Sequence, residues 1–228
     1  MHRRRIMTTS TEADGGALLT ASGARIEQTS FATIDAEAAP HAYDPDQWTL
    51  VRRLIHASGD FDFNGLTRFH PCAIAAGVAA MRAGFPILCD VEMVRAGLSR
   101  TRMAEFGLAA HQLIDRPEVI AAARVQGTTR AVQAIRLARR EGLVDGAVVG
   151  IGNAPTALLE LIRLIREEGV RPALILGMPV GFVSAAESKA VLAELDAVPW
   201  ILVSGRKGGS TLVVAALHAL MILAAHPR

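Results

Sequence analysis

The chain has 228 residues, of which 51% are hydrophobic, 20% charged and only 4% aromatic. This length suits one domain that buries roughly 70% of its unfolded surface, and the apolar fraction excludes a disordered protein. The 24 Lys and Arg residues against 22 Asp and Glu give a formal net charge of +2, so the chain lacks the basic excess of a dedicated nucleic-acid binder.

Cysteine use and hydropathy predict the compartment. Cys72 and Cys89 are too few for a disulfide framework and are expected to be small buried hydrophobes in a reducing compartment. The arginines near the start precede a polar stretch rather than the apolar region of a signal peptide. The longest apolar run, residues 211–225, is interrupted by His218 and is too short for a bilayer, which takes about 20 residues. We therefore expect a soluble cytoplasmic protein with neither a membrane nor a nucleic-acid partner.

The first residues lack the apolar periodicity of a folded element. Residues 1–22 are rich in Thr, Ser, Ala and Gly, which predicts a flexible N-terminal tail. No internal repeat follows, and residues 23–226 are expected to form a single domain.

The first predicted helix begins after Asp44, whose side chain is expected to cap it. Pro45 suits the first helical position, and Gln47 completes a capping box. Four apolar residues then recur at helical spacing and give one buried face: Trp48, Val51, Leu54 and Ile55. Gly59 ends the helix in the usual C-terminal position, and a second helix is predicted over 71–83.

The rest of the chain alternates strands, glycine-bearing turns and helices. Strands are predicted over 86–89, 147–152, 173–177 and 200–203, and helices over 158–168, 185–195 and 210–224. Such alternation predicts an α/β protein, here a three-layer α/β/α fold with a mainly parallel sheet in one domain. Ligands of these folds bind outside the carboxyl ends of the strands, so functional residues are expected in the glycine-rich turns.

Familiar cofactor motifs are incomplete. Gly150-Ile151-Gly152 opens like a dinucleotide fingerprint, but Pro155 stands where the third glycine belongs. In residues 205–210 the lysine precedes two glycines rather than the Ser or Thr of a P-loop. The histidines and cysteines match no metal-binding spacing, and no serine lies in a nucleophile elbow. The sequence therefore predicts no metal site and disfavours a nucleotide-dependent enzyme.

Five segments, in one order, carry a resemblance to a known family. They are residues 54–59 (LIHASG), 86–94 (PILCDVEMV), 151–158 (IGNAPTAL), 177–189 (GMPVGFVSAAESK) and 205–210 (GRKGGS). Together they resemble the precorrin-8X methylmutase family of cobalamin biosynthesis, over about Ile26 to Leu220. The resemblance implies an isomerase that moves a methyl group from C-11 to C-12 of a corrin precursor, giving hydrogenobyrinic acid or its cobalt form. It also implies a homodimer with an α/β/α fold, no cofactor, and one histidine that protonates a ring nitrogen.

The same resemblance assigns the site residues. The catalytic histidine corresponds to His56, the serine of the family's Ile-Glu-x-x-Ser-Phe motif to Ser30, and the arginine of its Gly-x-Thr-Arg motif to Arg130. Ser30 and Arg130 are thereby expected to contact substrate. The further residues expected to bind substrate are Arg53, Asn153, Thr156, Gly208, Gly209 and Ser210.

The residues themselves favour some of these roles. His56 lies in the last turn of its predicted helix, where the negative helix end favours the protonated imidazole and the neighbouring arginines oppose it. That balance suits proton transfer, although a histidine that only caps the last carbonyls is the alternative. Arg130 stands at a predicted helix start, where a cation is unfavourable unless an anion binds there. The alternative for Arg130 is a solvated side chain.

The glycine turns have two interpretations as well. Gly208, Gly209 and Ser210 offer close backbone approach and a helix cap, which suits an anion cradle for a substrate carboxylate. An ordinary strand-to-helix turn has the same composition. Asn153 and Thr156 occupy an equivalent turn, where helix capping is the alternative to substrate binding.

The chain departs from the family pattern in places. Ser58 replaces the usual cysteine, His218 a common asparagine, and residues 103–114 lack a typical Gly-Asn-Glu pattern. Glu187 and Lys189 are expected to be surface or packing residues without a role in the reaction. The rival functions are a corrinoid-binding carrier without turnover and a nucleotide-dependent α/β enzyme.

Overall fold

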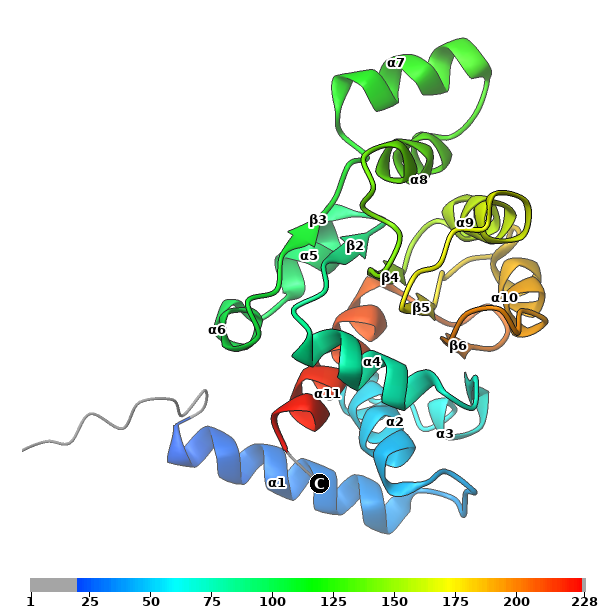
Figure 1. Ribbon diagram of the computed structural model, residues 1–228. Helices are drawn as coiled ribbons and strands as arrows, with labels where there is room; N and C mark the ends of the chain where they lie inside the picture. The colour runs from blue at the N-terminus through cyan, green and yellow to red at the C-terminus, as the bar shows by residue number, and fades with distance from the viewer. Residues whose placement is uncertain (1–19, 227–228) are drawn as a thin grey trace, which may run out of the picture.

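The computed structural model describes residues 20–226, which form helices around a single six-stranded sheet (Figure 1). The helices are α1 (Ala21–Glu37), α2 (Pro45–Ser58), α3 (Phe63–Leu66), α4 (Ala73–Arg82), α5 (Glu92–Gly97), α6 (Arg100–Glu105), α7 (Pro117–Gln126), α8 (Arg130–Arg140), α9 (Pro155–Glu168), α10 (Ala185–Ala193) and α11 (Ser210–Ala225). The strands are β1 (Thr67–Phe69), β2 (Ile87–Cys89), β3 (Ala110–His111), β4 (Val148–Ile151), β5 (Leu174–Gly177) and β6 (Trp200–Val203).

The sheet has the strand order β1-β6-β5-β4-β2-β3. Every neighbouring pair is parallel except the edge strand β1, which runs antiparallel to β6. β3 lies on one side of β2 and β4 lies on the other, so the order in which strands join the sheet reverses between β2 and β4. In open α/β sheets the carboxyl ends of such a pair frame the usual ligand crevice.

Helices cover both faces of the sheet, which confirms the predicted three-layer α/β/α fold. Successive strand residues alternate between two hydrophobic cores: Leu174 and Leu176 of β5 belong to one and Ile175 to the other. The first core is closed by α2, α4 and α11, and the second by α8, α9 and α10 (Figure 1). The α1 helix packs outside this body, against α2.

The predicted elements of the centre are confirmed. The strands predicted over 86–89, 147–152, 173–177 and 200–203 are β2, β4, β5 and β6, and the predicted helices are α2, α4, α9, α10 and α11. The capping of α2 follows the sequence, because the Asp44 carboxylate accepts the N–H groups of Asp46 and Gln47 at 2.9 Å each. Gly59 closes the helix with φ 65°.

Two expectations about other residues need correction. The α1 helix begins at Ala21 and so includes the last two residues of the expected tail, and most of that tail (1–19) lies outside the described residues. Cys72 is exposed at the start of α4, so its assignment to the core is wrong, whereas Cys89 is buried in β2. Cys72 follows a turn in which its own N–H binds the His70 ring at 3.2 Å, which keeps it outside the apolar face of α4.

Candidate active site

Helices α1 and α2 bring Ser30 and His56 to one cavity. The cavity has a volume of about 300 Å³, and both residues line it. The two helices are held together by ion pairs, since Arg53 Nη2 lies 3.0 Å from Glu27 Oε1 and Arg52 Nη1 lies 2.7 Å from Asp35 Oδ2. The pairing of these two site residues thus depends on a helix that the sequence did not predict.

The imidazole of His56 is exposed and unpaired. The Gly59 N–H donates to the Ile55 carbonyl at 2.8 Å, and Ser58 Oγ donates to the Leu54 carbonyl at 2.8 Å, so other groups satisfy the end of α2. Within residues 20–226 the ring makes no hydrogen bond, and its one ring contact is Phe31, at 5.2 Å between centroids. A capping role for His56 has no support, and both ring nitrogens are open to a ligand.

Phe31 places the imidazole beside two guanidinium groups. The Cζ atoms of Arg52 and Arg53 lie 4.6 and 5.3 Å from the centroid of the Phe31 ring. Burial lowers the pKa of Arg53, which Glu27 opposes, yet an arginine stays charged in proteins. Arg53 therefore holds α1 through its ion pair with Glu27, and its positive charge lies near His56.

Lys207 connects the His56 helix to a second group of site residues. Its ammonium lies 2.5 Å from Asp60 Oδ2 and 2.6 Å from Asp62 Oδ2, just after the end of α2. The next residues after Lys207 are the expected substrate contacts Gly208, Gly209 and Ser210. This glycine turn is thereby held on the side of the molecule that carries His56.

The glycines of these turns are required by close packing at the carboxyl edge of the sheet. A Cβ on Gly208 would lie 2.3 Å from the Met178 carbonyl oxygen, and one on Gly152 would lie 2.7 Å from Ser210 Cα. The Gly209 N–H donates to the same Met178 carbonyl at 2.8 Å. Among residues 20–226 no side chain caps the start of α11, and the N–H groups of Leu212 and Val213 donate to the Gly209 carbonyl, which leaves those of Ser210 and Thr211 for a ligand.

Asp90 occupies the crevice between β2 and β4. This buried carboxylate accepts the N–H groups of Gly152, Asn153 and Ala154 at 3.1, 2.7 and 2.9 Å. Burial raises the pKa of Asp90, and the three donors oppose that rise. The backbone N–H of Asn153 is therefore already used, and only its exposed side chain remains for substrate. Sequence reasoning gave Asp90 no role, although an acidic residue directly after a buried strand was a visible signal.

Arg130 and Thr156 lie apart from His56. Arg130 begins α8 as predicted, but its partner is Asp115, at 3.1 Å between Nη1 and Oδ1. Thr129 caps the same helix and its hydroxyl lies 2.9 Å from that of Thr156. Arg130 lines a separate cavity of about 500 Å³ that shares no residue with the His56 cavity. The candidate residues thus come from helices on both faces of the sheet, His56 from α2 and Arg130 from α8.

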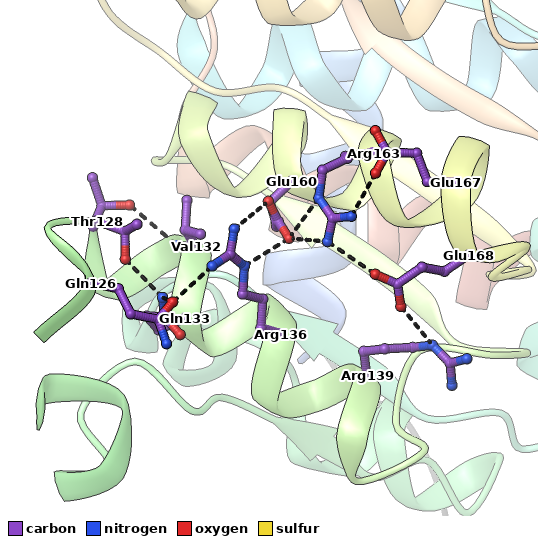
Figure 2. Close-up of polar contacts among 11 residues, drawn as sticks. Gln126, Thr128, Val132, Gln133, Arg136, Arg139, Glu160, Arg163, Glu167 and Glu168 are labelled. Carbon is purple, nitrogen blue, oxygen red and sulfur yellow. Dashed lines mark hydrogen bonds and ion pairs between the residues drawn. The ribbon is translucent and has the colours of Figure 1, made fainter. Parts of the chain in front are cut away.

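A polar network fixes the segment that carries Arg130. Figure 2 shows Glu160 of α9 between two arginines, with Arg136 Nε at 2.9 Å and Arg163 Nη2 at 2.7 Å. Burial opposes ionisation of Glu160, but the two guanidinium groups outweigh it and hold its pKa below the usual value. Gln133 donates to Thr128 in the turn before α8 at 2.8 Å. This network ties the turn to the body of the sheet.

His218 has a structural contact rather than a place in the His56 cavity. Its Nε2 accepts the Ser99 N–H at 3.0 Å and so joins α11 to the start of α6. Burial, aided by the charges of Arg102 and Arg53, lowers the pKa of His218 to about 4. The imidazole is therefore a neutral acceptor at physiological pH.

The depressed pKa of His218 predicts a loss of stability in mild acid. An unfolded histidine titrates near pH 6.5, so the unfolded state binds the extra proton first, and stability falls as pH drops from about 6.5 to 4. His218→Asn keeps an acceptor that does not titrate, and its free energy of unfolding should fall less over this range. Urea unfolding of both proteins at pH 7.5, 6 and 5 measures the difference, and parallel pH curves would contradict it.

Over residues 20–226, no three side chains of the metal-binding types gather around one point. No helix in that region is both long and apolar enough to cross a membrane.

Comparison with known proteins assigns the family. The family model described as precorrin-8X methylmutase matches residues 25–223. The chain belongs to the precorrin-8X methylmutase family. This match runs from α1 into α11 and contains every candidate site residue, so the resemblance noted in five segments extends over almost the whole chain.

Individual methylmutases agree with this assignment. A cobalt-precorrin-8 methylmutase of Leptospira interrogans is 47% identical over 206 residues, covering 88% of this chain and 94% of its own. A precorrin-8X methylmutase of Pseudomonas aeruginosa is 45% identical over 202 residues, covering 87% and 94%. The crystal structure of a Thermus thermophilus precorrin-8X methylmutase is 53% identical, covers 89% and 97%, and superposes with a TM-score of 0.84. A corrinoid carrier and a nucleotide-dependent enzyme have no support among these methylmutases.

Proposed function

We propose that this methylmutase moves a methyl group from C-11 to C-12 of precorrin-8X, or of its cobalt form, with His56 as the proton donor. The observation that carries the proposal is the unpaired imidazole of His56 in a cavity that Ser30 also lines. Its two ring nitrogens have no partner within residues 20–226, and an acid must reach its target directly to transfer a proton.

The mechanism needs one mobile proton. Protonated His56 gives its proton to a nitrogen of the macrocycle, which makes the ring electron-poor. The bond between the methyl group and C-11 then breaks as the bond to C-12 forms. Loss of the proton from the ring nitrogen back to His56 completes the isomerisation, so no net proton, electron or group is consumed. Orientation and proton transfer are each recognised sources of rate enhancement.

The carboxylate side chains of the substrate would need polar partners in and beyond the His56 cavity. Ser30 offers a hydroxyl in that cavity, and the glycine turn before α11 offers the backbone N–H of Ser210, since the N–H of Gly209 already donates to Met178. Such helix ends bind anions. The exposed side chain of Asn153 stands at the neighbouring turn. These groups would fix the macrocycle while His56 acts.

A homodimer accounts for the remaining candidates. Arg130 and Thr156 lie on the face of the sheet opposite α2, so one chain does not bring them to the His56 cavity. We infer that a second copy supplies them to the substrate. The cytoplasmic location and the reaction without a cofactor stay predictions.

Turnover of authentic substrate tests the proposed reaction. Purified protein is mixed with precorrin-8X in buffer without added nucleotide or metal, and the visible absorption spectrum is followed. We expect the spectrum of hydrogenobyrinic acid to appear with more product molecules than enzyme molecules. Pigment that stays bound and unchanged would instead identify a carrier.

A further inference from the structure

Lys189 is a buried cation without a counter-charge. Its side chain on α10 is 1% exposed, and its Nζ donates to the backbone carbonyl of Lys207 at 2.7 Å. Within residues 20–226 this is the one hydrogen bond of the amine, and no carboxylate pairs with it. An ammonium group has three donors, and burying one without an anion is costly.

The charge state of this amine follows from its surroundings. Burial alone lowers the pKa of Lys189, to about 8, with no contribution from a charged side chain. The helix packs against α9 and β6, and neither supplies a carboxylate to the amine. The nearest charged residue by contact, Lys207, directs its own ammonium to Asp60 and Asp62. Lys189 is thus mostly protonated at neutral pH despite its burial.

The carbonyl that Lys189 holds belongs to the glycine turn of the site. Lys207 is fixed from two sides, its backbone by Lys189 and its side chain by the two aspartates after α2. The residues that follow, Gly208 to Ser210, lead into the uncapped start of α11. A helix start is itself electropositive. The ammonium of Lys189 and the positive end of α11 therefore both lie next to this turn.

At the neighbouring turn the chain itself supplies an anion to the backbone N–H groups. At the start of α9 the N–H groups of Gly152, Asn153 and Ala154 are neutralised by the carboxylate of Asp90. In the turn before α11 the chain supplies the ammonium of Lys189 at the Lys207 carbonyl, and within residues 20–226 no carboxylate accepts the N–H groups at the start of the helix. The second turn therefore differs from the first in having no anion of the described chain at its backbone N–H groups.

We propose that Lys189 is a positioning residue that holds the glycine turn by its backbone and places a buried positive charge behind a substrate carboxylate. This inference rests on the proposed function of the same site. The contact would act on binding of the substrate rather than on proton transfer, because the amine is linked to the turn and not to His56.

Replacement of Lys189 by methionine separates this role from a purely structural one. Methionine has a similar length and no charge, so it removes the cost of burying an unpaired ammonium together with the hydrogen bond to the Lys207 carbonyl. We expect Lys189→Met to keep the melting temperature of the wild type or to raise it. Its KM for precorrin-8X and its Kd for hydrogenobyrinic acid should rise about tenfold or more, with kcat changed less than threefold. The control Arg166→Met removes an exposed cation that lies 3.7 Å from Glu194 and should change none of these values.

Each outcome decides the inference. A KM and a Kd within threefold of wild type would overturn it, and so would a lower melting temperature accompanied by a lower kcat alone. The Kd is measured by titrating hydrogenobyrinic acid, so it tests Lys189 even if the wild type proves to bind the pigment without converting it. Conversion by the wild type with unchanged binding by Lys189→Met would leave the proposed function intact and refute only the role of Lys189. A wild type that does not bind hydrogenobyrinic acid would overturn both.

Discussion

Replacing His56 by alanine is expected to lower kcat for precorrin-8X by about 10²–10⁴-fold, the usual contribution of a positioned acid. The fold should not change, because the imidazole is exposed and Phe31 is its one ring contact among residues 20–226. The Kd for hydrogenobyrinic acid should stay within a few-fold of the wild type. The spectrum of a mixture with precorrin-8X gives the rate, and thermal unfolding checks the fold.

A second histidine provides the control for this result. His226 is also exposed but lies beyond α11, outside the His56 cavity, so His226→Ala should convert substrate at the wild-type rate. Conversion by His56→Ala at that same rate would remove His56 from the mechanism while leaving the reaction assigned.

The His56→Ala variant also tests whether two subunits share a site. If a second copy supplies Arg130, then mixing inactive His56→Ala subunits with inactive Arg130→Ala subunits should restore part of the activity, because each mixed dimer contains one intact site. Recovery of activity after exchange of subunits is the expected result. Mixtures no more active than their components would argue against a shared site.

Replacing Asp90 by alanine is expected to cost about 3–5 kcal/mol of folding free energy, because the backbone N–H groups of three residues lose a buried charged acceptor. For a chain of this size that corresponds to a fall in melting temperature of about 10 °C. Urea unfolding followed by circular dichroism measures the change. Asp90→Asn should fall between the wild type and alanine, since its amide accepts through one oxygen only.

An exposed aspartate shows what burial contributes to this effect. Asp115 pairs with Arg130, and both side chains are more than half exposed, so Asp115→Ala should cost less than about 1 kcal/mol. Equal losses for the two alanine variants would contradict the role given to Asp90.

Much of the central fold was predictable because its signals are local. The capping box at Asp44 and the apolar spacing of α2 mark a helix whatever its neighbours are, and β4 to β6 are short apolar runs followed by glycines. The α1 helix was missed because it buries only Ile34 and so has no apolar stripe. The strands β1 and β3 have three and two residues, too few for a periodic pattern.

The site was predictable only in part, since its geometry is not local. Motif resemblance selected His56 and Ser30, but their shared cavity depends on the unpredicted helix α1. The resemblance also grouped Arg130 with them, whereas its helix packs on the other face of the sheet. Asp90 and Lys189 lie in two of the segments that carry the resemblance, but it assigned neither of them a role. Their roles depend on the backbone groups that they contact, and those contacts form only when the fold brings the turns together.

The carboxylate at the start of α9 has a consequence for how this methylmutase behaves among other metabolites. In many α/β proteins the same position receives the phosphate of a nucleotide, but here a phosphate would meet the negative charge of Asp90 and backbone donors that are already taken. We therefore expect adenine nucleotides and inorganic phosphate, which are abundant in cells, not to bind in this crevice. We expect competitive inhibition by such anions to be absent at this turn, because an anion of the chain itself already occupies its backbone donors.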